Sequence, residues 1–166
     1  MDIAVATRPV QPDDAARFGR LWPRLSPDTV YRRFHSPVHD LPPETVRRLV
    51  TVDHDRREAV AAIVGGEVVG VARYDRSPDD PGTGEFAILV EDAWQGMGLG
   101  RQLLTELVEL AAARGVRTLT ATVQPDNDAV IGLIRRLLPD ATFTRDVDVL
   151  DVRSPLHPHR NRKESP

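Results

Sequence analysis

The 166-residue sequence contains no cysteine. It therefore has no disulfide bond, no zinc site built on thiolates and no cysteine nucleophile. Lysine is almost absent too, because Lys163 is the only one and the other basic residues are arginines. Positive charge is not in excess, since the formal net charge is −3. A nucleic-acid binder normally carries a basic face, so we expect no nucleic acid among the partners.

Long apolar runs are also missing, and none approaches the length of a membrane span. The first residues, Met1–Ile3, lack the basic and apolar parts of a signal peptide, so we expect a cytoplasmic protein without a membrane partner. The composition is that of an ordinary globular protein. We expect one domain over residues 1–153, as a monomer or homodimer, and a disordered polar tail over residues 154–166.

Hydrophobic periodicity predicts alternating helices and strands. Helices are expected over residues 12–22, from Ser26 to Phe34, over 42–50, after the glycine-rich segment at 95–100 and over 125–137. Strands are expected over residues 5–10, 59–64, 67–74, 85–90, 118–123 and within 141–152. The pair 59–64 and 67–74 reads as a hairpin around Gly65-Gly66. This order predicts an α/β or α+β fold around one mixed sheet.

The glycine-rich segment lies between an apolar strand and an amphipathic helix. It reads Gln95-Gly96-Met97-Gly98-Leu99-Gly100 and is followed by Arg101. The start of a helix presents unpaired N–H groups and the positive end of the helix dipole. Glycines let such a backbone approach an anion closely, and Arg101 adds a cation. We therefore predict that this segment binds the phosphates of a ligand.

Two phosphate-binding classes do not fit this segment. A P-loop ends in Gly-Lys-Ser/Thr, whereas the chain continues as Gly100-Arg101-Gln102. A dinucleotide fingerprint has the spacing G-x-G-x-x-G and an acidic residue about 20 positions later. Here the spacing is G-x-G-x-G, and the next strand ends in Val123-Gln124. The structural alternative is a tight strand-to-helix turn without a ligand, although three alternating glycines exceed what one turn needs.

The pattern Gln-x-x-Gly-x-Gly, after a strand and at the start of a helix, resembles the acetyl-CoA signature of the GNAT superfamily of N-acetyltransferases. The surrounding order matches too, with Glu85–Val90 before it and Val123–Asn127 after the next strand, and the resemblance extends over residues 5–152. It implies a GNAT-like α/β (α+β) fold with a mixed, mostly antiparallel sheet, flanked by helices and splayed at the cofactor-binding strand. It also implies acetyl-CoA as the co-substrate.

The resemblance assigns roles to several residues outside the glycine-rich segment. Backbone groups of Ile88, Leu89 and Val90 would hydrogen-bond the pantetheine arm in the splayed gap, and one N–H would polarise the thioester carbonyl. Glu85 takes the position of the general base in many protein-acetylating members, the alternative being a solvated strand end. Asn127 would either contact the cofactor arm or cap the next helix.

One stretch departs from the family pattern. Many relatives carry a tyrosine late in the helix after Asn127, followed by Gly-Phe, and this tyrosine protonates the leaving thiolate. Here Arg135–Asp140 contains neither feature. Tyr31 and Tyr74 are expected to be packing residues. Either the thiolate leaves without a dedicated acid, as its modest basicity permits, or an acid comes from elsewhere.

The acceptor is less well defined by the sequence. Residues 25–34 and 52–56 look like the acetyltransferase domain of bacterial protein lysine acetyltransferases, so a protein lysine is the first expectation. A small amine, including an amino-sugar antibiotic, is the second, and a catalytically silent acyl-CoA-binding module is the non-enzymatic alternative. Side chains of the consecutive residues Asp53-His54-Asp55 diverge, so no metal site is predicted, and His54 is expected near the acceptor.

Overall fold

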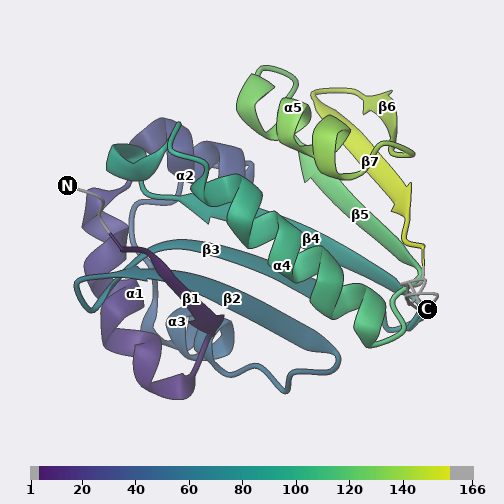
Figure 1. Cartoon of the computed structure of the whole chain (residues 1–166). Helices are drawn as coiled ribbons and strands as arrows, with labels where there is room; N and C mark the ends of the chain where they lie inside the picture. The colour runs from purple at the N-terminus through teal and green to yellow at the C-terminus, as the bar shows by residue number, and fades with distance from the viewer. Residues whose placement is uncertain (1–3, 158–166) are drawn as a thin grey trace.

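The computed structural model describes residues 4–157, and these residues form a seven-stranded sheet with the order β1-β2-β3-β4-β5-β7-β6 (Figure 1). Neighbouring strands are antiparallel except β4 and β5, which are parallel. The strands are β1 (Ala6–Pro9), β2 (Arg57–Val64), β3 (Glu67–Arg76), β4 (Thr83–Val90), β5 (Thr118–Val123), β6 (Thr142–Asp146) and β7 (Val149–Pro155). The predicted mixed, mostly antiparallel sheet is confirmed.

Helices cover both faces of the sheet. The α-helices are α1 (Ala15–Leu21), α2 (Pro27–Phe34), α3 (Pro43–Val50), α4 (Leu99–Ala113) and α5 (Asp128–Leu137), and the 3-10 helices are η1 (Pro12–Asp14), η2 (Trp22–Arg24) and η3 (Asp92–Trp94). Helices α4 and α5 pack on one face, while α1 and α3 pack on the other. None of the helices within residues 4–157 combines the length and apolarity that crossing a membrane requires.

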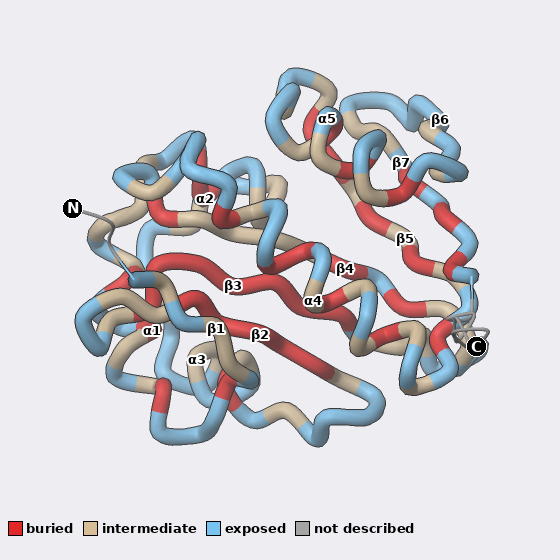
Figure 2. The backbone as a smooth tube through the Cα atoms, in the orientation of Figure 1, coloured by how far each residue is buried: buried red, intermediate tan, exposed pale blue. Residues whose placement is uncertain are grey.

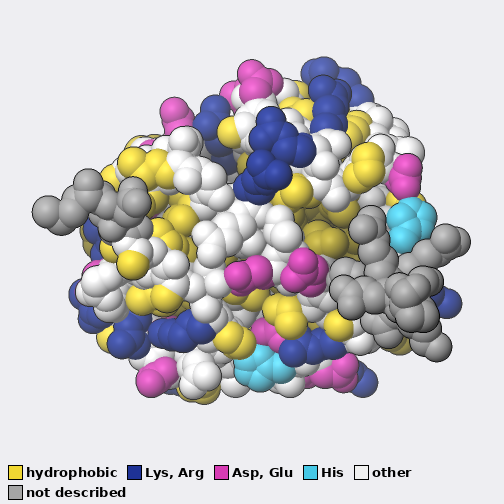
Figure 3. Space-filling view, viewed as in Figure 1, with side chains coloured by type: hydrophobic (Ala, Val, Ile, Leu, Met, Phe, Trp, Pro, Cys, Tyr) yellow, Lys and Arg dark blue, Asp and Glu magenta, His cyan; other side chains and the backbone are white. Residues whose placement is uncertain are grey.

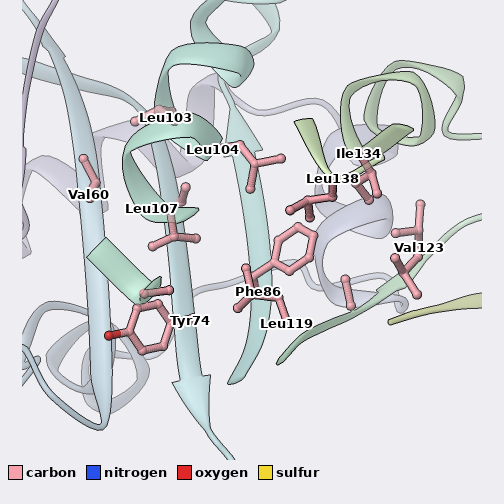
Figure 4. Packing of buried hydrophobic residues seen from close by; sticks show 14 of the residues in the cluster. Val60, Tyr74, Phe86, Leu103, Leu104, Leu107, Leu119, Val123, Ile134 and Leu138 are labelled. Atoms are coloured by element: carbon pink, nitrogen blue, oxygen red, sulfur yellow. The ribbon is translucent and has the colours of Figure 1, made fainter. Parts of the chain in front are cut away.

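Two apolar cores hold these layers together. On one face Leu103, Leu104 and Leu107 of α4 lie against the sheet residues Tyr74 and Phe86 (Figure 4). On the other face, residues from β1 to α3 pack on β2 and β3: Val10, Phe18, Leu21 and Val50 against Ala59, Ala61, Val68 and Val71. The buried residues of β2 and β3 form nearly continuous stretches because both faces of these strands are covered (Figure 2).

Local sequence signals account for several element boundaries. The hydroxyl of Ser26 accepts a hydrogen bond from the N–H of Thr29 at 3.2 Å, which caps α2. Gly65 and Gly66 join β2 to β3 with φ values of 56° and 78°. Because this left-handed region favours glycine, the pair forms the predicted hairpin turn.

The sheet opens between β4 and β5. These strands pair only where Thr83–Glu85 face Thr118–Thr120, and beyond Glu85 they diverge. Residues 121–123 of β5 pair with β7 alone. The predicted splay at β4 is therefore confirmed, and it leaves one edge of this strand open in the middle of the sheet.

Two predicted boundaries are wrong. The helix expected over residues 12–22 is divided into η1, α1 and η2, and Pro23 belongs to the last of these turns. The predicted tail starts too early, because β7 extends to Pro155 and the side chains of Ser154 and Leu156 are buried. Pairing of Ser154 with Leu119 of β5 outweighs the polar composition of this stretch. Residues 158–166 of the predicted tail lie outside the described residues.

Candidate active site

The glycine-rich segment connects η3 to the start of α4, and its glycines serve two purposes. Gly96 and Gly98 have φ values of 76° and 82°, which side chains rarely tolerate, and a Cβ at either position would meet nothing within 4 Å. Gly100 is helical instead, and a Cβ there would lie 3.4 Å from Cδ2 of Leu133. The first two glycines therefore shape the loop, and the third lies where α4 faces Leu133 of α5.

The start of α4 offers unpaired hydrogen-bond donors. Its first helical hydrogen bond runs from the N–H of Gln102 to the carbonyl of Gly98, at 3.1 Å. The N–H groups of residues 99–101 therefore have no acceptor within the helix. Arg101 and Arg136 line the adjacent cleft, and basic side chains gather over the region between the start of α4 and α5 (Figure 3). This arrangement suits a pyrophosphate.

A cleft of about 490 Å³ extends from this loop along the open edge of β4, a size typical of cofactor sites. It brings together ten of the predicted cofactor residues: Ile88, Leu89, Val90, Gln95, Gly96, Gly98, Leu99, Gly100, Arg101 and Asn127. Met97 is the exception, because its side chain is 67% exposed and does not line the cleft. The predicted contact between Met97 and the cofactor therefore stays a prediction only for the backbone groups of this residue.

Only alternate residues of β4 can present their backbone to the gap. The N–H of Glu91 donates to Val69 of β3 at 2.8 Å, and the antiparallel register continues without a shift to Leu89 opposite Val71. In such a ladder the N–H and C=O of Leu89 point to β3, whereas those of Ile88 and Val90 point to the other side. The predicted backbone role therefore fits Ile88 and Val90, and for Leu89 it is wrong.

Gln95 connects the loop to the surrounding elements. Its amide nitrogen donates to the carbonyl of Val90 at 3.0 Å and to the hydroxyl of Thr29 at 3.2 Å. Asp92, one turn earlier, accepts from the N–H of Ser26 at 2.9 Å. Gln95 thus links the glycine-rich loop to β4 and α2 by hydrogen bonds. Its predicted contact with the cofactor stays a prediction, and these bonds already engage its amide nitrogen.

Asn127 caps the helix, and its predicted contact with the cofactor arm stays a prediction. Its Oδ1 accepts the N–H of Val130 at 3.4 Å, which caps α5, and the residue also lines the cleft beside β4. Helix α2 contributes a second group of cleft residues that sequence reasoning missed, including Thr29, Arg32 and Arg33. No local pattern indicates this placement, because it depends on how α2 packs against β4.

Glu85 lies where the paired part of β4 and β5 ends. Its side chain is exposed and lines two neighbouring hollows, one shared with His35 and Asn127, the other with Asp75 and Arg73. Asp75 is directly opposite Glu85 in the β3–β4 register, so both carboxylates are on one face of the sheet. Within residues 4–157 Glu85 takes part in no ion pair, whereas Asp75 accepts from Nε of Arg57 at 3.1 Å. Glu85 is therefore the available carboxylate at the mouth of the gap.

Other candidates lie away from this site. Tyr74 is fully buried in the core, as expected, but Tyr31 is 45% exposed and does not pack as predicted. Neither tyrosine lines the cleft at β4. His54 lies before β2, where its Nδ1 is 2.9 Å from Oε1 of the buried Glu58. It lines none of the hollows around Glu85, so the expectation that it lies near the acceptor is wrong.

Comparison with known proteins agrees with this geometry. A family model described as the Acetyltransferase (GNAT) family matches residues 20–138. Acetyltransferase PA5475 of Pseudomonas aeruginosa is 30% identical over 130 residues, which cover 76% of this chain and 69% of that protein. The L-methionine sulfoximine/L-methionine sulfone acetyltransferase of the same species is 44% identical over 81 residues, which cover 47% of each chain.

A solved structure extends the similarity to nearly the whole chain. The GNAT domain of S. lividans PAT superposes with a TM-score of 0.83 at 31% identity, over 92% of this chain and 90% of that one. The chain thus combines the predicted fold, a splayed β4 and a glycine-rich segment at the start of α4 with a family match over most of its length. The chain belongs to the GNAT family of acetyltransferases.

Proposed function

We propose that this acetyltransferase moves the acetyl group of acetyl-CoA, its co-substrate, directly to a primary amine. The observation that carries the proposal is the gap between β4 and β5, which connects the loop at Gly98 to the carboxylate of Glu85. The pyrophosphate would bind at the loop, and the pantetheine arm would follow the open edge of β4. Acetyl-CoA is made and used in the cytoplasm, where we expect the enzyme to act.

The chemistry needs a base and a place for developing negative charge. An alkyl ammonium must lose a proton before its nitrogen can attack the thioester carbon. Glu85 would accept that proton, and the N–H of Ile88, which points to the gap, would stabilise the oxygen of the tetrahedral intermediate. Collapse of this intermediate forms the amide and breaks the carbon–sulfur bond. Because neither tyrosine lines the cleft, CoA would leave as the thiolate, and the second proton of the amine nitrogen would pass to solvent.

Two classes of acceptor have support. The resemblance of residues 25–34 and 52–56 to protein lysine acetyltransferases favours a protein lysine. The relative named for L-methionine sulfoximine and L-methionine sulfone favours the amine of an amino acid. An amino-sugar antibiotic is less suitable, because Arg33 and Arg73 line the hollow beside Glu85 and would repel a polycation.

Steady-state kinetics with a panel of lysine peptides, amino acids and simple alkyl amines test the proposal. We expect free CoA and acetylated amine in equal amounts from at least one class. Because the chain has no cysteine to carry the acetyl group, double-reciprocal plots should intersect, as they do for a ternary complex. Parallel lines, or an acetylated enzyme that transfers its acetyl group to the amine, would contradict direct transfer.

A further inference from the structure

Arg73 is a buried cation with unused hydrogen-bonding capacity. It lies on β3, is 5% exposed, and its Nη2 has no hydrogen-bond partner among residues 4–157. Its Nη1 reaches the carbonyl of Leu49 only at 3.4 Å. Buried guanidinium groups are normally paired with an anion, because leaving water without compensation is costly. The environment that the described chain provides for Arg73 is therefore incomplete.

Arg33 brings a second cation to the same place from α2. It lines the hollow that also contains Arg73, and its guanidinium carbon lies 4.7 Å from the ring centroid of Phe34. Neither arginine belongs to an ion pair within the described part of the chain, and Asp75, a nearby carboxylate, is bonded to Arg57. Burial lowers the pKa of Arg33 and lowers that of Arg73 to about 10, so both remain cationic at neutral pH.

The two arginines lie beside the proposed base. In the β3–β4 register Arg73 faces Ala87, and two residues further along Asp75 faces Glu85. All four side chains therefore project from one face of the sheet. Two residues of a strand span about 7 Å. Arg33 lines both the cofactor cleft and the hollow with Glu85, whereas Arg73 lines only the hollow with Glu85 of these two. An anion bound by Arg73 would thus belong to the acceptor.

We propose that Arg33 and Arg73 bind a carboxylate of the acceptor, so that the substrate is an amine that also carries a carboxylate. This inference rests on the proposed acetyl transfer to an amine and assigns its substrate class. A planar guanidinium matches a carboxylate through two parallel hydrogen bonds. The carboxylate belongs either to a free amino acid or to an acidic residue beside a lysine.

Matched ligand pairs test this specificity. Calorimetry with CoA-loaded enzyme would compare L-methionine sulfone with its carboxamide, L-lysine with cadaverine, and lysine peptides flanked by Asp with the same peptides flanked by Asn. We expect at least one carboxylate member to bind about 10–100-fold more tightly than its partner without the carboxylate. Acetyl transfer to the same pairs, measured as kcat/KM, should show the same preference. The first two pairs identify a free amino acid, and the peptide pair identifies an acidic protein site.

The variants Arg73→Met and Arg73→Lys separate recognition from folding. Arg73→Met should bring the ratio of the two Kd values in the preferred pair close to one. Arg73→Lys should restore part of this preference for the carboxylate member. Arg48→Met is the matched control, because Arg48 is an exposed cation on the nearby helix α3 and lines neither hollow with Glu85. Equal binding of both members of every pair, or an unchanged ratio in folded Arg73→Met, would overturn the inference. Loss of turnover on every amine, with the binding preference intact, would overturn only the proposed function.

Discussion

Glu85 and Asp75 are neighbouring carboxylates with different surroundings, and this difference favours Glu85 as the proposed base. Asp75 is bonded to Arg57, whereas Glu85 has no ion pair among the described residues. We expect Glu85→Gln to lower kcat by about 10²–10⁴-fold at neutral pH, because it removes the proton acceptor but keeps the shape of the side chain. Much of the loss should return as the pH rises, since the amine then deprotonates in solution.

Asp75→Asn is the comparison for this variant. It removes the opposite carboxylate in the same register while leaving Glu85 in place. We expect it to retain most of kcat, so that steady-state rates across pH distinguish the two positions. Equal losses in both variants would remove the assignment of the base to Glu85, and full activity of Glu85→Gln would place the base elsewhere.

Gly98 tests the phosphate site by charge rather than by shape. Its φ of 82° tolerates asparagine and aspartate better than other side chains, and the space beside it is open. Gly98→Asp should weaken acetyl-CoA binding at least about tenfold more than Gly98→Asn, because only the aspartate repels the phosphates. The difference should decrease with added salt. Calorimetry in low and high salt measures it, and equal affinities for the two variants would contradict a pyrophosphate at this loop.

Individual residues of the site were only partly predictable. Gly96, Gly98 and Gly100 could be recognised because their spacing is local. The bonds of Gln95 to Thr29 and Val90 could not, because they depend on the packing of α2. The exclusion of Leu89 followed once the pairing of β4 with β3 was known, since the pairing determines which backbone groups point to the gap.

At the scale of elements, the start of the chain is held by one buried carboxylate. Asp14 is fully buried at the end of η1 and accepts hydrogen bonds from Nη1 and Nη2 of Arg8 at 2.8 and 2.6 Å. It also accepts the N–H of Gln11 at 2.8 Å. The bonds from Arg8 hold the pKa of Asp14 below its usual value. Asp14 therefore connects β1, η1 and the beginning of α1.

Asp14→Asn should lower the free energy of unfolding by about 2 kcal/mol at pH 7. A depressed carboxylate pKa stabilises the folded state above the unfolded pKa, and this stabilisation is lost as the pH falls through the folded pKa. The difference from wild type should therefore decrease below about pH 4. Denaturant titrations at several pH values measure it. Asp13→Asn, an exposed neighbour, should have little effect, and a pH-independent loss in Asp14→Asn would contradict the assignment.

Elements with local signals were predicted better than those that depend on distant partners. The cap of α2 at Ser26 and the turn at Gly65-Gly66 could be read from neighbouring residues. The end of β7 could not be read in this way, because Ser154 pairs with Leu119 of β5, and the N–H of Leu156 donates to the carbonyl of Arg117 at 2.7 Å. Composition reports only average polarity, so a short polar strand near the end of the sequence resembles a disordered tail.

At the scale of the whole molecule, the site lies where two parts of one sheet meet. Strands β1–β4 and strands β5–β7 are joined by the three residue pairs between Thr83–Glu85 and Thr118–Thr120. Helix α4 packs on the first part and α5 on the second, and the cleft lies between them. The order of elements was predictable from the sequence. The width of the opening was not, since it depends on where the pairing of β4 and β5 stops.

The open edge of β4 separates recognition of the donor from recognition of the acceptor. In the proposed complex the acetyl donor would contact main-chain groups of β4 and α4, which any residue type supplies. The acceptor would contact the side chain of Arg73 on β3, which does not line the cofactor cleft. Substitutions on β3 can therefore alter the amine while the use of acetyl-CoA persists. Divergence within such a lineage would then proceed mainly by changing which amines are modified, with the donor inherited unchanged.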